Sequence, residues 1–331
     1  MQSSRKKSKK IIRKKNNKKN NKKKEKKNNY RKKKELMIGG QAVIEGVMMR
    51  TKNHYAVAVR KSDNRISVKK ERFDSLTQKN RFLGLPIVRG IIILIETIIL
   101  GFKALNYSAS QSLEQEYAEQ GARNSGEAGE KLNGFVMGLT IAFSVILALA
   151  LFKFLPLLAA TLFKNNLGGS NFLFNLIDGA TKLLVLIGYI WLISRFKDVK
   201  RVFEYHGAEH KTVHCYESGK KLTPKNAMNM PKAHHRCGTT FLLVVVVLSI
   251  IFYLLIPFNM NFWLKLVIRI LFLPLIAGLS YEWIKLTGRI RNRFFTRILA
   301  GPGLLVQRLT TREPDEEQLS VAIKALRAVT E

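Results

Sequence analysis

The chain has 331 residues, a formal net charge of +34 and 47% hydrophobic residues. The apolar residues gather in runs that reach the roughly 20 residues a helix needs to cross a hydrocarbon core, which excludes an ordinary soluble globular domain. No apolar run occurs before residue 85, so we expect no secretory signal peptide.

The N-terminal tail, residues 1–34, contains 19 Lys and Arg residues and a single acid, Glu25. Such a segment cannot bury enough apolar surface to fold, so we expect a disordered basic tail. It can bind anionic lipid headgroups at a membrane surface. It can also bind RNA or a ribosome, because lysine runs bind phosphate without sequence choice. The sequence leaves both partners open.

Residues 36–84 show the period of β-strands. The stretches YAVAVRK (55–61) and RISVKKERF (65–73) alternate apolar and polar residues around a polar turn. Together with QAVIEGVMMR (41–50), they predict a three-stranded antiparallel meander. We expect it to form a small β-rich cytoplasmic domain beside the membrane.

The next apolar stretch, 85–105, contains two charged residues, Arg89 and Glu96. Charges are costly in lipid unless they are paired or buried. If this stretch crossed the membrane, every later loop would change sides. We therefore predict a re-entrant or interfacial helix here. The acidic linker that follows, 106–133, contains five Glu residues and would suit the outer side better, although acids weigh little in topology.

Four longer apolar runs follow, and each is long enough to span a membrane as a helix. They form two predicted transmembrane hairpins, 134–194 and 238–284. The fold class predicted is a mainly α integral membrane protein with four transmembrane helices, one re-entrant or interfacial helix and a small cytoplasmic antiparallel β meander. The four spans are 134–163, 172–194, 238–257 and 262–284.

The Lys and Arg content of the loops sets the orientation of these spans. The loop 195–237 contains ten bases and four acids, and 285–313 contains seven bases and one acid. Both stretches belong on the cytoplasmic side, together with the N-terminal tail. The sequence therefore predicts a multi-pass protein of the bacterial inner (cytoplasmic) membrane with both termini in the cytoplasm.

The C-terminal segment, 285–331, begins as a basic stretch and ends in EPDEEQLSVAIKALRAVTE (313–331). Pro314 lies near the expected first turn, and acidic residues follow it, as is typical of a helix N-terminus. The sequence predicts an amphipathic C-terminal helix. Its apolar face contains Leu319, Ile323 and Leu326.

The loop 195–237 also holds five of the six histidines and both cysteines. Within HGAEHKTVHCYE (206–217), His206 and His210 lie one helical turn apart, a separation that one metal ion can bridge. Glu209 flanks the same helix face. The string H-G-A-E-H also fits the pattern H-x-x-E-H, in which two histidines bind zinc and the glutamate activates a water. A five-residue pattern with three fixed positions recurs often by chance. The match therefore predicts a metal site only if a third ligand lies nearby.

Two nearby groups could supply that ligand. One consists of His214, Cys215 and Glu217, and the other is HHRCG (234–238), which contains His234 and Cys237. The alternative is an exposed basic helix whose histidines have no ligand role, with Cys237 a small buried apolar residue. On the cytoplasmic side both cysteines are expected to be thiols.

Five blocks of the sequence carry a resemblance to a known family. They are GGQAVIEGVMMR (39–50), FEYHGAEHK (203–211), CYE (215–217), HHRCGTTF (234–241) and GPGLLVQRLTTREPDEEQLSVAIKAL (301–326). In matching order they resemble the YqhQ-like family of bacterial membrane proteins, the domain-of-unknown-function family numbered 1385, which is labelled a predicted metal-dependent enzyme. The resemblance covers about residues 36–328.

The resemblance also points to individual positions. It does not include a histidine at position 214, and it favours His234 over His235. It implies that GGQAVIEG is a fixed feature, for which a backbone turn with positive φ at Gly39 or Gly40 is a physical reason. The positions that it carries over are His206, Glu209, His210, Lys211, Glu217, His234, Arg236 and Cys237.

The leading hypothesis is a cytoplasmic divalent-metal site, with Zn²⁺ as the expected ion, that performs hydrolysis at the membrane surface. Glu209 is the predicted general base, and Lys211 or Arg236 is predicted to stabilise developing negative charge. His206 and His210 are the expected ligands, completed by His234 or Cys237. The full set of candidate metal ligands is His206, His210, His234, Cys237 and Glu217.

Two other functions remain compatible with the sequence. One is a non-enzymatic membrane assembly or tethering factor with a structural metal site and an RNA- or lipid-binding tail. A structural zinc has four protein ligands, whereas a catalytic zinc keeps one position open, so site closure separates these two hypotheses. The other is ion transport, based on the intramembrane charges Asp178, Lys182 and Arg269. An ion pair that braces the helices explains those three residues equally well.

Overall fold

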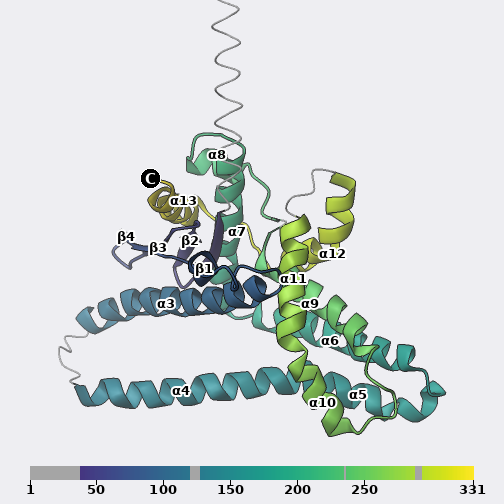
Figure 1. Cartoon of the computed structure of the whole chain (residues 1–331). Helices are drawn as coiled ribbons and strands as arrows, with labels where there is room; N and C mark the ends of the chain where they lie inside the picture. Colours follow the sequence, from purple (N-terminus) through teal and green to yellow (C-terminus); the bar gives the residue numbers. More distant parts are fainter. Residues whose placement is uncertain (1–37, 120–126, 235, 288–292) are drawn as a thin grey trace, which may run out of the picture.

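The structure is a computed structural model that describes residues 38–119, 127–234, 236–287 and 293–331. It is mainly helical, with one antiparallel sheet near the N-terminus (Figure 1). The basic tail, residues 120–126 and His235 lie outside the described residues, and the predictions made for them stay predictions.

The sheet is a meander of four strands in the order β1-β2-β3-β4. The sequence predicted three strands because 41–50 was taken as one strand, and this was wrong. The chain turns between Val43 and Gly46, where Glu45 adopts a left-handed φ of 52°. A polar residue tolerates that conformation at a tight turn. The strands are β1 (Gly39–Val43), β2 (Gly46–Arg50), β3 (His54–Arg60) and β4 (Ile66–Arg72).

Helices cover both faces of this sheet, because successive side chains of a strand point to opposite sides. Met49 and Ala58 pack on α7 (Lys197–Glu217) and α13 (Glu316–Thr330), whereas Met48 packs on α3 (Val88–Glu119). Figure 1 shows α13 and α3 on opposite sides of the strands. The predicted C-terminal helix is confirmed as α13, and its apolar face is buried through Leu319, Ile323 and Leu326.

Helix α3 is longer than the predicted helix at 85–105. It continues to Glu119, and α4 begins at Glu127, so most of the predicted linker at 106–133 is helical. The residues SASQSLEQEYAE (108–119) include several good helix formers, which explains the extension. Glu96 is buried and accepts hydrogen bonds from Ser75 Oγ (3.0 Å) and Arg50 Nη2 (3.4 Å). That pairing removes the cost of its charge.

The remaining helices form the apolar part of the molecule and its connections (Figure 1). Short helices α2 (Leu76–Lys79) and α8 (Pro224–Met228) belong to the sheet region. The others are α4 (Glu127–Leu149), the π-helix η1 (Ala150–Phe154), α5 (Leu155–Leu162), the 3₁₀ helix η2 (Lys164–Leu167), α6 (Asn171–Ile193), α9 (Gly238–Tyr253), α10 (Phe262–Leu271), α11 (Leu273–Thr287) and α12 (Arg293–Thr310).

Among the described residues, two helices are long and apolar enough to cross a membrane, Gly138–Leu162 and Asn171–Ile193. The pair α10 and α11 would make a third span but is bent by 42°. Pro274, close to the start of α11, explains the break, since proline lacks the N–H that would continue the helix. Helix α9 has only 16 residues, fewer than the predicted run. These helices indicate membrane association, with two or three candidate spans in place of the four predicted.

The tips of the two predicted hairpins lie together. The side chain of Asn171 at the start of α6 donates hydrogen bonds to the carbonyl oxygens of Leu254 (2.8 Å) and Ile256 (3.2 Å), just after α9. Phe174 packs beside Phe258 and Phe262 in the same region. The loop 195–237 therefore connects the opposite ends of α6 and α9.

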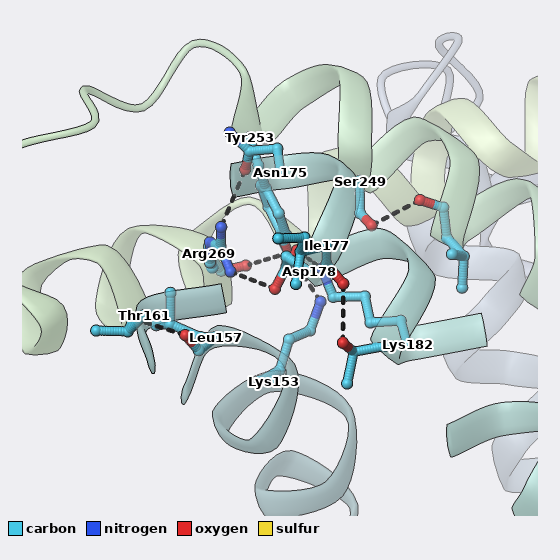
Figure 2. A network of polar contacts seen from close by, with 12 residues as sticks. Lys153, Leu157, Thr161, Asn175, Ile177, Asp178, Lys182, Ser249, Tyr253 and Arg269 are labelled. Carbon is cyan, nitrogen blue, oxygen red and sulfur yellow. Dashed lines mark hydrogen bonds and ion pairs between the residues drawn. The ribbon is translucent and has the colours of Figure 1, made fainter. Parts of the chain in front are cut away.

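A cluster of charged side chains is buried where η1, α6, α9 and α10 meet (Figure 2). Asp178 accepts a hydrogen bond from Arg269 Nη1 (2.6 Å) and forms an ion pair with Lys182. Arg269 Nη2 donates to Asn175 Oδ1 (3.0 Å), and Lys153 Nζ donates to the hydroxyl of Tyr253 (2.8 Å). We call these six residues the ion cluster.

Candidate functional site

Helix α7 carries the histidines of the loop 195–237. It begins after Phe196 with Asp198 in its first turn, where a negative charge suits the helix dipole. It ends at Glu217, and Gly219 follows with φ 73°, the left-handed conformation common after helix ends. One side of α7 packs on the sheet through Tyr205 and Ala208. An adjoining face carries His206, Glu209 and His210.

The two predicted histidine ligands are fixed by backbone carbonyls. His206 Nδ1 lies 2.8 Å from the carbonyl oxygen of Thr310, and His210 Nδ1 lies 2.6 Å from that of Lys232. A carbonyl only accepts, so each Nδ1 carries a proton, and in the neutral ring Nε2 then keeps its lone pair. Metal-binding histidines typically hold their second ring nitrogen in this way.

The third member of this group is Cys237. Its Sγ lies 3.2 Å from His206 Nε2. One ligand atom from each of His206, His210 and Cys237 lies within 4.8 Å of the other two. We call these three residues the His/Cys group. Of the two residues expected to complete the set, Cys237 lies in this group, and His234 lies in a neighbouring one.

A second group adjoins the first and contains His214, Glu217 and His234. His214 Nε2 donates to the carbonyl oxygen of Ala233 (2.9 Å), and His234 Nε2 faces Glu217 Oε2 at 3.7 Å. The guanidinium of Arg236 binds the other oxygen of Glu217. Two of the predicted ligands, His234 and Glu217, therefore lie beside the His/Cys group together with His214.

Glu209 packs against the backbone of β1. It is buried, and its carboxylate accepts a hydrogen bond from the N–H of Gly40. A Cβ at Gly40 would lie 2.7 Å from Glu209 Oε1, so a larger residue there would force the Glu209 side chain to shift. Neither Gly39 nor Gly40 is among the glycines with positive φ. The predicted reason for the glycine pair was wrong, and close approach to Glu209 replaces it.

The environments of the two carboxylates push their pKa values apart. Burial raises the pKa of Glu209 to about 8, although the nearby His206 opposes the shift. Burial acts in the same direction on Glu217, but hydrogen bonds and charge interactions with His234 and Arg236 outweigh it and lower the pKa to about 2. Glu209 therefore holds a proton readily near neutral pH, whereas Glu217 is ionised.

Burial also governs the nitrogen and sulfur groups. It lowers the pKa of His234 to about 4 and lowers that of His210 as well, because a charged ring is poorly solvated inside the protein. Burial alone would raise the pKa of the Cys237 thiol, but contacts with His210 and Thr239 lower it overall. The site thus combines neutral imidazoles with a thiol that ionises more easily than usual, the states in which these groups bind metals.

A cavity of about 650 Å³ opens beside these residues. Its walls come from β1, α3, α7 and the start of α9. Side chains from the site line one part of it: His206, Glu209, His210, His234, Arg236 and Cys237.

The two predicted charge-stabilising residues are separated by the fold. Arg236 lines the cavity. Lys211 does not, since its ammonium donates to the carbonyl oxygen of Met228 (2.8 Å) and binds Glu313 (2.9 Å). Lys211 holds α7 to α8 and to the chain before α13, so only Arg236 fits the predicted role.

The sequence did not single out the residues of α12 that support the site. Gln307 is fully buried, accepts from the N–H of His234 (2.8 Å) and donates to its carbonyl oxygen (2.7 Å). Gly207 lets the chain after α12 reach α7, because a Cβ there would lie 2.0 Å from the carbonyl oxygen of Arg312. The only signal was that these residues fall within the blocks 203–211 and 301–326 that carry the family resemblance, which gave no role to either.

These features define a mainly helical protein with two or three helices apolar enough to span a membrane, a small antiparallel sheet and a cavity lined by histidine, cysteine and glutamate. The chain belongs to the DUF1385 family, described as a protein of unknown function, which matches residues 85–331. It is 36% identical over 292 residues to the protein named "Uncharacterized protein YqhQ" from Bacillus subtilis (strain 168), across 87% of this chain and 90% of that relative. No solved structure matches the chain. The family resemblance found in the sequence is confirmed.

Proposed function

We propose that this protein is a metal-dependent hydrolase at the membrane surface, with a divalent cation bound by His206, His210 and Cys237. The observation that carries the proposal is the convergence of two imidazoles and a thiol, with both imidazoles tied through Nδ1 to backbone carbonyls. Nitrogen and sulfur donors are the ligands that zinc prefers, so Zn²⁺ is the expected ion.

The surroundings of the group favour catalysis over a structural role. A structural zinc uses four protein ligands, whereas a catalytic zinc uses three and leaves a position for water or substrate. The His/Cys group supplies three ligand atoms and lines the 650 Å³ cavity. Substrate can therefore reach the side of the group that no protein ligand covers.

The residues around the group have complementary roles in hydrolysis. A divalent cation supplies Lewis acidity, which polarises a substrate oxygen and eases deprotonation of water. The positive charge of a cation held by the neighbouring His/Cys group would favour the ionised form of Glu209. In that form Glu209 accepts one proton from water as the water oxygen bonds to the electrophilic centre, and returns that proton to the leaving group as the scissile bond breaks. Arg236, at the cavity wall, stabilises negative charge on the reacting centre.

The finer topology is part of the same proposal. The hairpin tips meet at one end of α6 and α9, and the basic loop 195–237 lies at the other. Basic loops stay in the cytoplasm. We therefore place the site on the cytoplasmic face of the bacterial inner membrane, with both termini on that side. The short helix α9 and the bent pair α10 and α11 supply the third and fourth passages of this arrangement.

Elemental analysis of the detergent-purified full-length protein tests the metal. We expect about one Zn²⁺ per chain, as for a mononuclear site, and its loss in His210→Ala. His54→Ala is the matched control, because His54 lies on β3 outside the cavity. Equal metal content in all three proteins, or none in the wild type, would contradict the proposal.

One observation favours a second function, a membrane assembly or tethering factor with a structural metal. The ring centroids of His210 and His234 are 5.6 Å apart, so a small shift would make His234 a fourth ligand and close the site. The basic tail would then bind anionic lipid, RNA or a ribosome. Loss of metal in His234→Ala, together with no effect of Glu209→Gln on growth, would favour this function over hydrolysis.

A further inference from the structure

Helix α3 is covered on one face and bare on the other. Leu100 and Ala104 are buried beneath the sheet. On the opposite face, five large apolar side chains are between 37% and 51% exposed: Ile95, Ile98, Ile99, Phe102 and Leu105. A row of this kind is unusual on a soluble protein. It is the face that a helix lying in the membrane interface presents to lipid.

The bare face of α3 continues into the cavity of the candidate site. Ile98, Phe102 and Leu105 belong to both. Leu242, on the first turns of α9, adds a further exposed apolar side chain to the cavity wall. The cavity therefore has a polar wall, formed by the His/Cys group and Glu209, and an apolar wall that joins a lipid-facing surface.

We propose that this cavity takes a membrane phospholipid, with its head group at the His/Cys group and an acyl chain along Phe102, Leu105 and Leu242. The proposal rests on the proposed hydrolase for the reaction at the head group, but not for the binding. The division into a polar and an apolar wall matches the two ends of an amphiphile.

A water-soluble substrate fits this cavity less well. Its polar groups would face Phe102 and Leu105, which offer no hydrogen bonds, and burying an unpaired polar group is costly. The cavity also lies where the apolar helix α9 begins, directly after Cys237. The head group of a lipid sits at the same depth, where the hydrocarbon region meets water. The acyl chain can then enter along α3 without crossing water.

The glycines of the cavity provide a way to fill it. Gly238 lines the cavity, and a Cβ there meets no atom within 4 Å, so Gly238→Phe can place a ring in the cavity. Gly39 has the same two properties and gives a second, independent variant, Gly39→Phe. Gly188→Phe is the matched control, since Gly188 on α6 also has no atom within 4 Å and does not line the cavity.

The test uses full-length protein in vesicles of phosphatidylethanolamine and phosphatidylglycerol. A small fraction of the phosphatidylglycerol carries a photoactivatable diazirine in one acyl chain, and mass spectrometry locates the labelled residues. In the wild type we expect label on Phe102 and Leu242. In Gly238→Phe and Gly39→Phe that label falls about tenfold, the change for a loss of about 1.4 kcal/mol in binding. The label on Ile95 stays unchanged in these variants. In the Gly188→Phe control, the label on Phe102 and Leu242 stays at the wild-type value.

Equal labelling of Leu242 in the wild type and in both filled variants would overturn the proposal, because the label would then come from bulk lipid. Absence of label from Phe102 while Ile95 is labelled would overturn it too. Zinc content of the same samples separates the two proposals. If the protein contains no zinc but filling the cavity still reduces the label, the hydrolase proposal is wrong and the lipid proposal stands. If the protein contains zinc but filling the cavity does not change the label, the lipid proposal is wrong and the hydrolase proposal stands.

Discussion

The ion cluster and the His/Cys group are both buried polar clusters, but their polar atoms differ in the partners that the protein provides. Both carboxylate oxygens of Asp178 are taken by cations, one by Arg269 and one by Lys182 (Figure 2). None of the six residues lines the cavity of the candidate site. In the His/Cys group, by contrast, backbone carbonyls hold Nδ1 of both histidines. Nε2 of His206 faces the thiol of Cys237, and the group lies beside a cavity. The first arrangement braces helices, and the second leaves room for a cation.

The chemistry of the two clusters explains the difference. Buried charges need partners of opposite sign, because an unpaired charge in an apolar interior is very costly. The carboxylate of Asp178 therefore stabilises cations from two helices and ties α6 to α10. In the His/Cys group, burial lowers the pKa of His210, which favours its uncharged ring and removes this demand. This contrast favours bracing over ion transport for Asp178, Lys182 and Arg269.

The largest effect is expected when the carboxylate at the centre of the ion cluster is removed. In Asp178→Ala, Arg269 and Lys182 lose their carboxylate, and the folded state should lose about 3–5 kcal/mol. Asn175→Ala, which removes one hydrogen bond to Arg269, should cost about 2 kcal/mol. Denaturant unfolding of both proteins in detergent measures the two values. A stable Asp178→Ala protein would remove the bracing role and revive transport.

The next effect concerns the two cysteines, both of which are buried thiols outside any disulfide. Cys237→Ser should lower zinc affinity by more than the about 10–100-fold typical for loss of a residue that only orients a metal ligand, since a ligand itself is lost. Cys215→Ser should leave the affinity unchanged, because Cys215 packs in the core between the sheet and α7. Zinc titration with a competing chelator measures both. Equal behaviour of the two variants would mean that Cys237 is not a ligand.

A third change separates base from ligand. Glu209→Gln keeps the shape of the side chain but cannot accept the proton of a water, so a hydrolase should lose about 10²–10⁴-fold in rate. Zinc content should stay at the wild-type value. Elemental analysis and the growth of cells that depend on the variant provide the two measurements. Loss of zinc in this variant would make Glu209 a ligand and remove the proposed base.

The sequence predicted those parts of the fold and site that depend on local patterns. The turn-by-turn spacing of His206 and His210 put them on one face, and the apolar period of α13 identified its buried residues. Composition located the apolar helices, but only two or three of the four predicted spans are candidates, and the bend of α10 and α11 at Pro274 was not weighed. The β1–β2 turn was missed for a similar reason. Glu45 is not a residue that marks a turn by composition, and only its φ reveals it.

The remaining parts of the site depend on contacts between distant segments. Gln307 holds His234 across 73 residues, and Thr310 orients His206 across 104. No periodicity connects such positions. The proximity of Cys237 to His206 and His210 likewise follows from how α9 begins beside α7, which the spacing within the loop cannot fix. Lys211 was misjudged because its place on the helix is near the site, while its long side chain reaches Glu313.

The smallest expected effect tests the supporting wall of the site with two neighbouring glycines. Gly40→Ala places a Cβ 2.7 Å from Glu209 Oε1, so the side chain must shift, and overpacking of this kind costs about 1–3 kcal/mol. Gly39→Ala meets no atom within 4 Å and should be silent. Glu209 is the proposed general base and not a metal ligand. Gly40→Ala should therefore lower activity and stability while zinc content stays constant. If both variants behaved alike, the glycine pair would serve the strand itself, and the link between β1 and Glu209 would have no functional weight.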